Sequence, residues 1–306
     1  MRRPELLWCT AIDVPNTRDA LAAVAVSSAA MAQVTMSGYI NMQYNKANST
    51  AASTLGLWDA GLTFTASEDL GGGLKATGVF NLDSLHDRAN TAKNGDSSIS
   101  LSGGFGTVAA TRARSSHMAS NGAVFGAAIG KGFNDGVVFT RSETQTISLT
   151  SPELVPGLRV AVAAVRVATN ESLKTNVIGA TYSAGPLSLG VQQKSLNGAA
   201  TAATGQEDSQ TEAFVRYNAG VALIGVGYGS KQTATGDAVT SYGVSVPMGA
   251  FTVGFDAASR GDAEFMNYGV RYALSKRTVL HVSKGSFQTT ATNDTDQTRI
   301  RLAHSF

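Results

Sequence analysis

The sequence predicts an all-β fold, a transmembrane antiparallel β-barrel of about sixteen strands, and three observations support this prediction. Short turns rich in Gly, Pro, Asn and Asp alternate with longer polar stretches after residue 33. The segments between them alternate apolar and polar residues, which is the period of a β-strand. The chain ends in RIRLAHSF (299–306), which has one apolar face, whereas the last residues of soluble domains are usually frayed and polar.

Short turns and long polar stretches follow one another along the chain. The short turns are EDLGGG (68–73), GGFG (103–106), PELVPG (152–157), SAGP (183–186), NAG (218–220), PMGA (247–250) and LSKR (274–277). The long stretches are NKANSTAAST (45–54), RANTAKNGDSS (88–98), NGAATAATGQEDSQ (197–210) and TTATNDTDQ (289–297). Short periplasmic turns and long external loops are the organisation of an outer-membrane barrel, and soluble sandwiches lack this asymmetry.

The strand faces agree with a barrel. In LKATGVFNLD (74–83), Phe80 and Leu82 share one face while Asn81 and Asp83 lie on the other. A barrel with lipid outside and water inside accounts for this pattern in all the strands and leaves no free edge. Two alternatives stay open: a soluble all-β secreted protein, and a barrel of fourteen strands, because the chain is short for sixteen.

The first 32 residues differ from the rest. DALAAVAVSSAAMAQ (19–33) has the apolar run and small-residue ending of an export signal, which predicts a signal peptide over 1–32, cleavage after Ala32, and a barrel over 33–306. A retained N-terminal helix is the alternative. The only cysteine, Cys9, lies in this segment, so no disulfide is expected in the barrel. The net charge of +2 is too small to indicate a basic surface that binds nucleic acid.

A family resemblance rests on a series of motifs in a fixed order. SEDLGGGLKA (67–76), FNLD (80–83), LSGGFGTV (101–108), ISLTSPELVPGL (147–158) and the terminal aromatic strand resemble the general porins of Gram-negative bacteria, especially the sixteen-stranded porins of β-proteobacteria and Neisseria. The resemblance extends from about residue 34 to residue 306. It implies a passive diffusion channel for ions and small hydrophilic solutes in the outer membrane.

The resemblance also implies partners. They are two further copies of the chain in a homotrimer, outer-membrane lipid, and the assembly machinery, which recognises the terminal strand ending in Phe306. The trimer contact is expected on the outer faces of strands near both chain ends. The Gly-, Ala- and Val-rich segment VALIGVGYG (221–229) is expected to present such a close-packing outer face, although lipid contact explains it equally well.

In this family the third long loop folds inward and narrows the pore, and the matching loop here is 113–135. Family loops usually carry acidic residues in this segment, but this one has none before Asp135, and it contains Lys131. Arg112 matches a family arginine. Strict alternation from Val108 would point it at lipid, at a cost of about 2–4 kcal/mol near mid-membrane, so a bulge near Thr111 is expected to turn it inward.

Charged residues around this loop are the candidate site. The predicted constriction residues are Arg112, Arg114, Lys131, Asp135 and Arg141, and the predicted lumen-lining residues are Lys75, Asp83 and Arg301. Another family arginine is replaced by Gly61. A loop poor in carboxylates that faces arginines favours anions weakly. The alternative is a wide pore with little selectivity.

Catalytic and cofactor motifs are weak. GFGTVA (104–109) fits a dinucleotide-binding pattern, but a strand follows it instead of the helix that such a site requires, which favours a hairpin turn. The four histidines lack metal-ligand spacing, so no metal, cofactor or enzymatic activity is expected. Two further functions stay open: a barrel lipase using His304 on the outer wall, and an adhesin or receptor acting through the loops.

Overall fold

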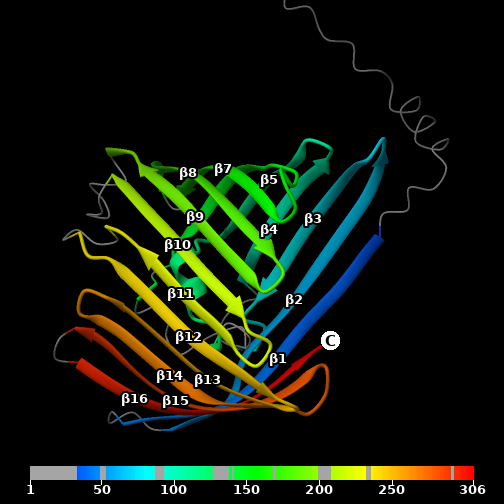
Figure 1. Cartoon of the computed structure of the whole chain (residues 1–306). Coiled ribbons are helices and arrows are strands. Elements are labelled where there is room, and N and C mark those ends of the chain that lie inside the picture. Colours follow the sequence, from blue (N-terminus) through cyan, green and yellow to red (C-terminus); the bar gives the residue numbers. More distant parts are fainter. Residues whose placement is uncertain are drawn as a thin grey trace, which may run out of the picture.

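The strands of the computed structural model close into one barrel (Figure 1). The structure describes residues 33–48, 53–86, 93–126, 138–139, 141–167, 170–198, 208–231, 236–290 and 293–306. Sixteen antiparallel strands pair with their neighbours in sequence, and β1 pairs with β16 to close the ring. The predicted barrel of about sixteen strands is therefore confirmed. The predicted signal peptide, residues 1–32, lies outside the described residues.

The first eight strands are β1 (Gln33–Ala47), β2 (Thr54–Gly71), β3 (Leu74–Asp83), β4 (Lys93–Gly103), β5 (Gly106–Arg114), β6 (Glu143–Thr150), β7 (Leu158–Val167) and β8 (Asn170–Ala184). The last eight are β9 (Leu187–Leu196), β10 (Ser209–Asn218), β11 (Leu223–Gly229), β12 (Val239–Met248), β13 (Phe251–Arg260), β14 (Ala263–Ala273), β15 (Thr278–Thr290) and β16 (Asn293–Ser305). One short 3-10 helix, η1 (Met118–Gly122), follows β5. No helix among the described residues is long and apolar enough to cross a bilayer.

All seven predicted short turns join consecutive strands at one end of the barrel. Gly185 and Gly249 are the first residues of two of these turns. Their φ angles are 55° and 63°, a left-handed conformation that glycine adopts without steric cost. The GFGTVA segment forms such a hairpin between β4 and β5 and leads into a strand, as expected.

The connections at the opposite end are shorter than predicted. Strand β4 already begins at Lys93, inside the stretch expected as a loop, and β15 and β16 are joined by residues 291–292 alone. The connections after β7 and β13 are also two residues long, 168–169 and 261–262. The polar composition of these stretches misled the prediction, because the ladder hydrogen bonds of a strand join backbone groups and do not require apolar side chains.

Side chains alternate between the two surfaces of the wall. On β11, Ile224, Val226 and Tyr228 are 48%, 56% and 49% exposed, whereas the intervening glycines are buried. On β16, Ile300 and Leu302 point outward and Arg301 is buried inside. An apolar outer surface and a polar inner surface are the arrangement of a barrel with lipid outside and a wet lumen.

The segment VALIGVGYG differs from the prediction. Its glycines lie on the inner face of β11 and not on an outer packing face. A Cβ atom on Gly227 would come within 1.9 Å of the Ala119 carbonyl oxygen, and one on Gly225 within 2.5 Å of the Gly122 oxygen. Glycine is required here because the chain after β5 lies directly against this wall.

The terminal aromatic residue closes the barrel. The Phe306 amide donates to the Gly38 carbonyl oxygen and the Gly38 amide donates to the Phe306 oxygen, both at 2.9 Å. The ring lies across Gly38, where an added Cβ would be 2.6 Å from the Phe306 Cζ atom. The last residue is therefore part of the β1–β16 seam.

Candidate pore and its inner wall

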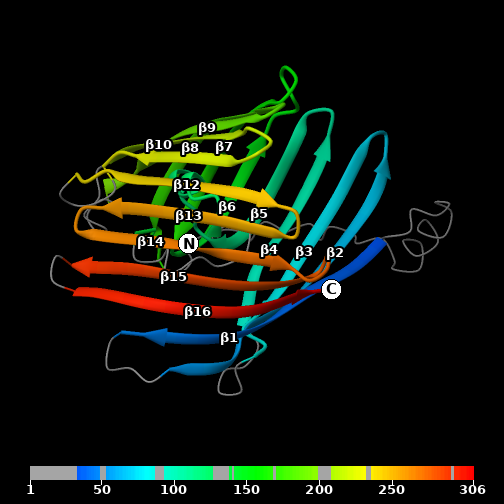
Figure 2. The same cartoon turned by 60° about the horizontal axis from the view of Figure 1, so that its bottom comes forward.

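The chain between β5 and β6 folds into the barrel, as the resemblance implied for the third long loop. The helix η1 lies inside the ring of strands (Figure 2). Its contacts are with the inner faces of β9, β10, β11 and β12. We call the described part of this connection, residues 115–126, 138–139 and 141–142, the inner loop.

Glu212 of β10 holds the start of the inner loop. Its carboxylate accepts hydrogen bonds from the Met118 amide at 2.5 Å, from the Lys194 ammonium at 2.5 Å and from the Gln192 amide at 2.9 Å. The ring nitrogen Nδ1 of His117 lies 3.1 Å from the same carboxylate. Glu212 is fully buried, and these partners compensate for the loss of its hydration.

The middle of the inner loop bonds to β10 again and to β12. Arg216 of β10 donates to the Asn121 carbonyl oxygen at 2.6 Å and to its side-chain oxygen at 2.9 Å. The Ser241 hydroxyl of β12 donates to the Ala119 carbonyl oxygen at 2.5 Å. Side chains of the wall therefore satisfy backbone groups of a loop that has no sheet partner of its own.

Asp256 of β13 binds the far end of the described segment. Its carboxylate accepts hydrogen bonds from the Phe125 amide, at 2.8 Å, and from the Gly126 amide. The buried ring of Phe125 packs against the His281 ring, with centroids 5.6 Å apart, and the Arg271 guanidinium lies 5.3 Å from its centroid. Residues Val138 and Phe139 return along β12–β15 in an apolar cluster with Val239, Ala258 and Phe265.

A row of basic side chains crosses the inner wall beside Phe125. Arg271, His281 and Arg301 are direct cross-strand partners on β14, β15 and β16, and Gln43 of β1 continues the row. Arg301 donates to the Gln43 side-chain oxygen at 3.2 and 3.0 Å. Arg299 lies two residues before Arg301 on the same face of β16, and it is 6% exposed. We call Arg271, His281, Arg299 and Arg301 the basic wall.

Several polar atoms around the basic wall find no protein partner among the described residues. They are Nε2 of Gln43, Oδ1 of Asn45, Oδ1 of Asn267, Nε of Arg271, Oγ of Ser283 and both ring nitrogens of His281. Buried polar groups are nearly always hydrogen-bonded to protein or water. Seven such atoms lie on one patch of the inner wall, where ordered water is the partner expected for them.

Arg112 does not lie where a bulge would have placed it. The pairing of β5 with both β4 and β6 runs without a register shift from Gly106 to Arg114, so Arg112 keeps the outward face of Val108. Its guanidinium bonds to the Glu143 carboxylate at 2.5 Å. Arg112 therefore follows the alternation of β5, and no bulge turns it inward. It lies near the external end of the strand, where the free-energy cost of a charge facing outward falls to about 0–1 kcal/mol.

The other predicted residues lie in several places. Arg114 donates to the Asp83 carboxylate at 2.7 Å, at the end of β5. Arg141 donates to the Ser115 carbonyl oxygen at 2.9 Å, so it ties the two ends of the loop together at its base. Lys75 lies in β3 beside the periplasmic turn, opposite Ser102. Lys131 and Asp135 lie outside the described residues.

The sequence analysis missed most of the basic wall. Only Arg301 was singled out, although the alternation in NYGVRYAL (267–274) places Arg271 on the polar face. Arg299 belongs to the same polar face as Arg301, and His281 had been considered only as a metal ligand. The usable signal was the alternation itself, which predicts the face of a residue but not its partners across the sheet.

Two observations concern the residues considered for metal or catalytic chemistry. No group of three or more His, Cys, Asp or Glu side chains that could hold a metal ion occurs within the described ranges. His304, the candidate of the lipase alternative, has its Nδ1 atom 2.9 Å from the Thr278 hydroxyl, and its ring stacks on Phe306. These contacts belong to the seam between β15, β16 and β1.

A comparison with protein families shows which family the chain belongs to. The family model described as Gram-negative porin matches residues 20–294, which is most of the chain. The chain belongs to the Gram-negative porin family. Porins are outer-membrane barrels with water-filled channels, so this porin is a passive diffusion channel of the outer membrane. Fold and family are those of channels, which does not favour the lipase, adhesin or receptor alternatives. No curated protein matches the chain in sequence.

Solved structures share the architecture. A mutant of Rh. blastica porin superposes with a TM-score of 0.66 at 12% identity, over 90% of this chain and 100% of that one. An anion-selective porin from Comamonas acidovorans superposes with a TM-score of 0.62 at 20% identity, with the same coverage of both chains. At these identities the likeness concerns the fold alone.

Proposed function

We propose that this porin prefers anions and that the basic wall sets this preference. The observation that carries the proposal is the row Arg271–His281–Arg301 with Arg299 beside it, facing the lumen next to the inner loop. Three guanidinium groups, one on β14 and two on β16, raise the local anion concentration, most strongly where the opening is narrow. The anion selectivity stated for the porin from Comamonas acidovorans is consistent with the proposal.

The carboxylates of the inner wall are also consistent with a preference for anions. Glu212 is bound by Lys194 and the Met118 amide, and Asp256 by two loop amides. Asp83 is paired with Arg114. Glu212 and Asp83 are thus compensated locally, while Asp59 and Asp256 lie near Arg301 and Arg271, so three guanidinium groups against two carboxylates keep the charge of this wall positive.

The test is the conductance of the refolded chain 33–306 in a planar bilayer under a potassium chloride gradient. We expect discrete current steps and a reversal potential with the sign of chloride preference. Steps with a reversal potential near zero would contradict the anion preference but not the channel. A folded barrel that gives no steps would contradict the channel itself.

We further propose that the porin is a homotrimer whose contact uses the outer faces of strands near both chain ends. Small residues occupy the outer faces there: Ala66 pairs with Gly78 across β2 and β3, and a Cβ on Gly78 would meet nothing within 4 Å. Such a surface allows close approach of a second copy. Native mass spectrometry should give the mass of three chains, and a monomer in mild detergent would contradict the proposal.

Phe306 is proposed as the residue that the outer-membrane assembly machinery recognises. We expect that deleting Phe306 strongly lowers the amount of barrel in outer membranes. Refolding in detergent should be affected less, because the deletion removes two seam hydrogen bonds worth about 0.5–1.5 kcal/mol each. The Phe306→Tyr variant retains the aromatic ring and the backbone pair, and should assemble normally. Equal amounts of barrel in outer membranes for the deletion variant and for the parent chain would contradict this role.

A further inference from the structure

Two aromatic side chains lie on the inner face of β1 and β2, and the first of them is Tyr39. Its ring lies over Gly61 of β2, where an added Cβ would be 3.0 Å from the Tyr39 Cε1 atom. The Tyr39 hydroxyl donates to the Asp59 carboxylate at 3.3 Å, which fixes the ring in this place. Gly61 stands where the family resemblance implied an arginine, so a tyrosine ring covers the position of that charge in this chain.

A bulge in β2 turns the second ring, that of Trp58, into the lumen. The pairing of β1 with β2 shifts by one residue between Asn41 and Met42, and Trp58 is the extra residue of β2. The centroid of its ring lies 6.0 Å from the guanidinium carbon of Arg299. Because Arg299 is buried on the inner face of β16, a ring so close to its guanidinium group also lies on the inner side of the wall.

Trp58 is accessible from the lumen, in contrast to the aromatic side chains that pack with the inner loop. It is 44% exposed, whereas Phe125, Phe139 and Phe265 are between 0% and 5% exposed. Trp58 also belongs to the external half of β2, which extends from Thr54 to Gly71. A solute that enters from the external side can therefore contact the open face of the indole ring.

The charge beside Trp58 is positive. Arg299 and Arg301 lie on the same face of β16, and the buried Asp59 carboxylate interacts electrostatically with Arg301, so two guanidinium groups stand against one carboxylate. Both guanidinium groups are nearly buried and attract an anion through space. Their field extends over the Debye length of about 8 Å at physiological salt, which is more than the 6.0 Å between the Arg299 guanidinium and the indole centroid.

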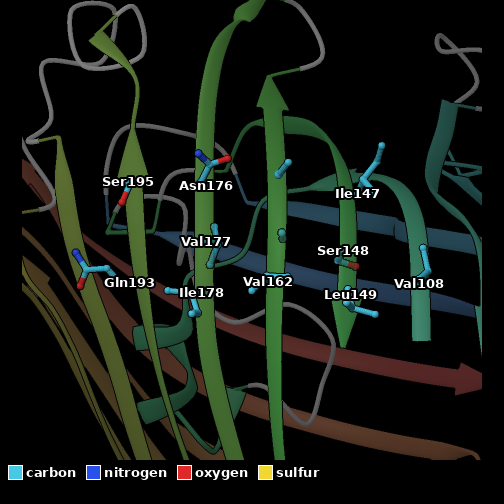
Figure 3. Close-up of a pocket in the computed structure, with 12 residues that line it drawn as sticks. Val108, Ile147, Ser148, Leu149, Val162, Asn176, Val177, Ile178, Gln193 and Ser195 are labelled. Atoms are coloured by element: carbon cyan, nitrogen blue, oxygen red, sulfur yellow. The ribbon is translucent and has the colours of Figure 1, made fainter. Parts of the chain in front are cut away.

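The wall formed by β5, β6 and β7 lacks this combination. The structure describes these three strands in full, and none of them contains an aromatic residue. On their inner face Ser148 and Ala163 are cross-strand partners, and the larger apolar side chains Ile147 and Leu149 lie on the outer face of β6 (Figure 3). An aromatic solute thus finds a ring to stack on at β1 and β2 and none along β5 to β7.

We propose that Trp58 and Tyr39 form an aromatic platform that selects aromatic carboxylates among the anions that pass the porin; this rests on the anion preference proposed above. The ring of the solute stacks on the open face of Trp58, and its carboxylate lies toward the positive potential of Arg299. Offset stacking of two rings is favourable beyond the apolar area that it buries. Tyr39 extends the apolar surface on the neighbouring strand. An aliphatic carboxylate has the same charge but no ring to stack.

The test compares how strongly benzoate and its saturated analogue cyclohexanecarboxylate reduce the chloride conductance of the intact porin in planar bilayers. The two probes have the same charge and nearly the same size, so a difference between them reports on the aromatic ring. In the parent porin we expect half-reduction at a concentration of benzoate about two- to tenfold lower, the range for one aromatic pair. Trp58→Leu should remove this difference, and Trp58→Phe should retain most of it.

Phe80→Leu is the matched control, because Phe80 is 43% exposed on the outer face of β3, in one cross-strand row with Ser97 and Arg112. It should leave the response to both probes unchanged. The reversal potential in potassium chloride, recorded in the same membranes, should be equal in all three variants because none of them alters a charge.

Three outcomes would overturn the platform. They are an equal effect of the two probes on the parent porin, an advantage of benzoate that persists in Trp58→Leu, and an equal loss of that advantage in Phe80→Leu, which would point to partition of benzoate into the bilayer. The chloride measurement keeps the two proposals apart. Chloride preference without an advantage of benzoate contradicts the platform alone, whereas an advantage of benzoate that depends on Trp58, without chloride preference, supports the platform and contradicts the anion preference.

Discussion

Removing two charges from the basic wall should abolish most of the anion preference. In Arg271→Gln/Arg299→Gln we expect the chloride-to-potassium permeability ratio to fall by about two- to fivefold per charge removed, because a unit charge at 4 Å in a water-like medium is worth about 1 kcal/mol. The single-channel conductance should change less, since the shape of the opening is retained. The measurement is the reversal potential in a potassium chloride gradient at low salt.

Glutamine is preferred to glutamate at these positions. Arg299 is buried, and a reversed charge beside Arg301 would test folding more than selectivity. The matched control is Arg159→Gln, the same chemical change on β7 beside the periplasmic turn, where Arg159 pairs with Glu153 at 3.1 Å. This variant should retain the parent reversal potential. An equal shift in both variants would mean that the basic wall has no special role.

The ionic strength provides a second check on the same prediction. The Debye length is about 8 Å at physiological salt and about 3 Å at 1 M, so a preference due to wall charges should decline as salt rises. The parent chain should approach the low selectivity of Arg271→Gln/Arg299→Gln at 1 M salt. A preference that does not depend on salt would indicate selection by size or by direct coordination.

The sequence predicted the features that depend on local chemistry. Glycine in a left-handed turn conformation, as at Gly185 and Gly249, and the alternation along each strand are properties of a few neighbouring residues. The barrel and its seven short turns followed from them. The inward fold of the third loop came from the family resemblance.

The errors concern features that depend on contacts across the sheet. The glycines of β11 were assigned to the outer surface because nothing in VALIGVGYG reveals that Ala119 and Gly122, about a hundred residues earlier, lie against them. Arg112 was expected inside because a charge facing lipid is costly, but the cost depends on its depth, which the sequence does not contain. The cross-strand row from Arg271 to Arg301 likewise required the register of three strands.

The close approach at Gly227 gives the other large expected effect. In Gly227→Ala the new methyl group would lie 1.9 Å from the Ala119 carbonyl oxygen, where ordinary contacts are about 3.5 Å or longer. A backbone atom cannot turn aside as a flexible side chain does, and the wall strand is held by pairing on both sides. We therefore expect η1 to shift toward the centre of the lumen, which narrows the channel.

The expected result for Gly227→Ala is a lower single-channel conductance with an unchanged sign of the reversal potential, because no charge is altered. Overpacking of this kind costs about 1–3 kcal/mol, which the inner loop, held by side-chain contacts and not by sheet pairing, should absorb before the barrel does, so heat stability of the barrel should be nearly retained. Gly104→Ala is the control, since its methyl group meets nothing within 4 Å in the short turn between β4 and β5. If Gly227→Ala folds and conducts like Gly104→Ala, η1 does not lie on β11 in the membrane.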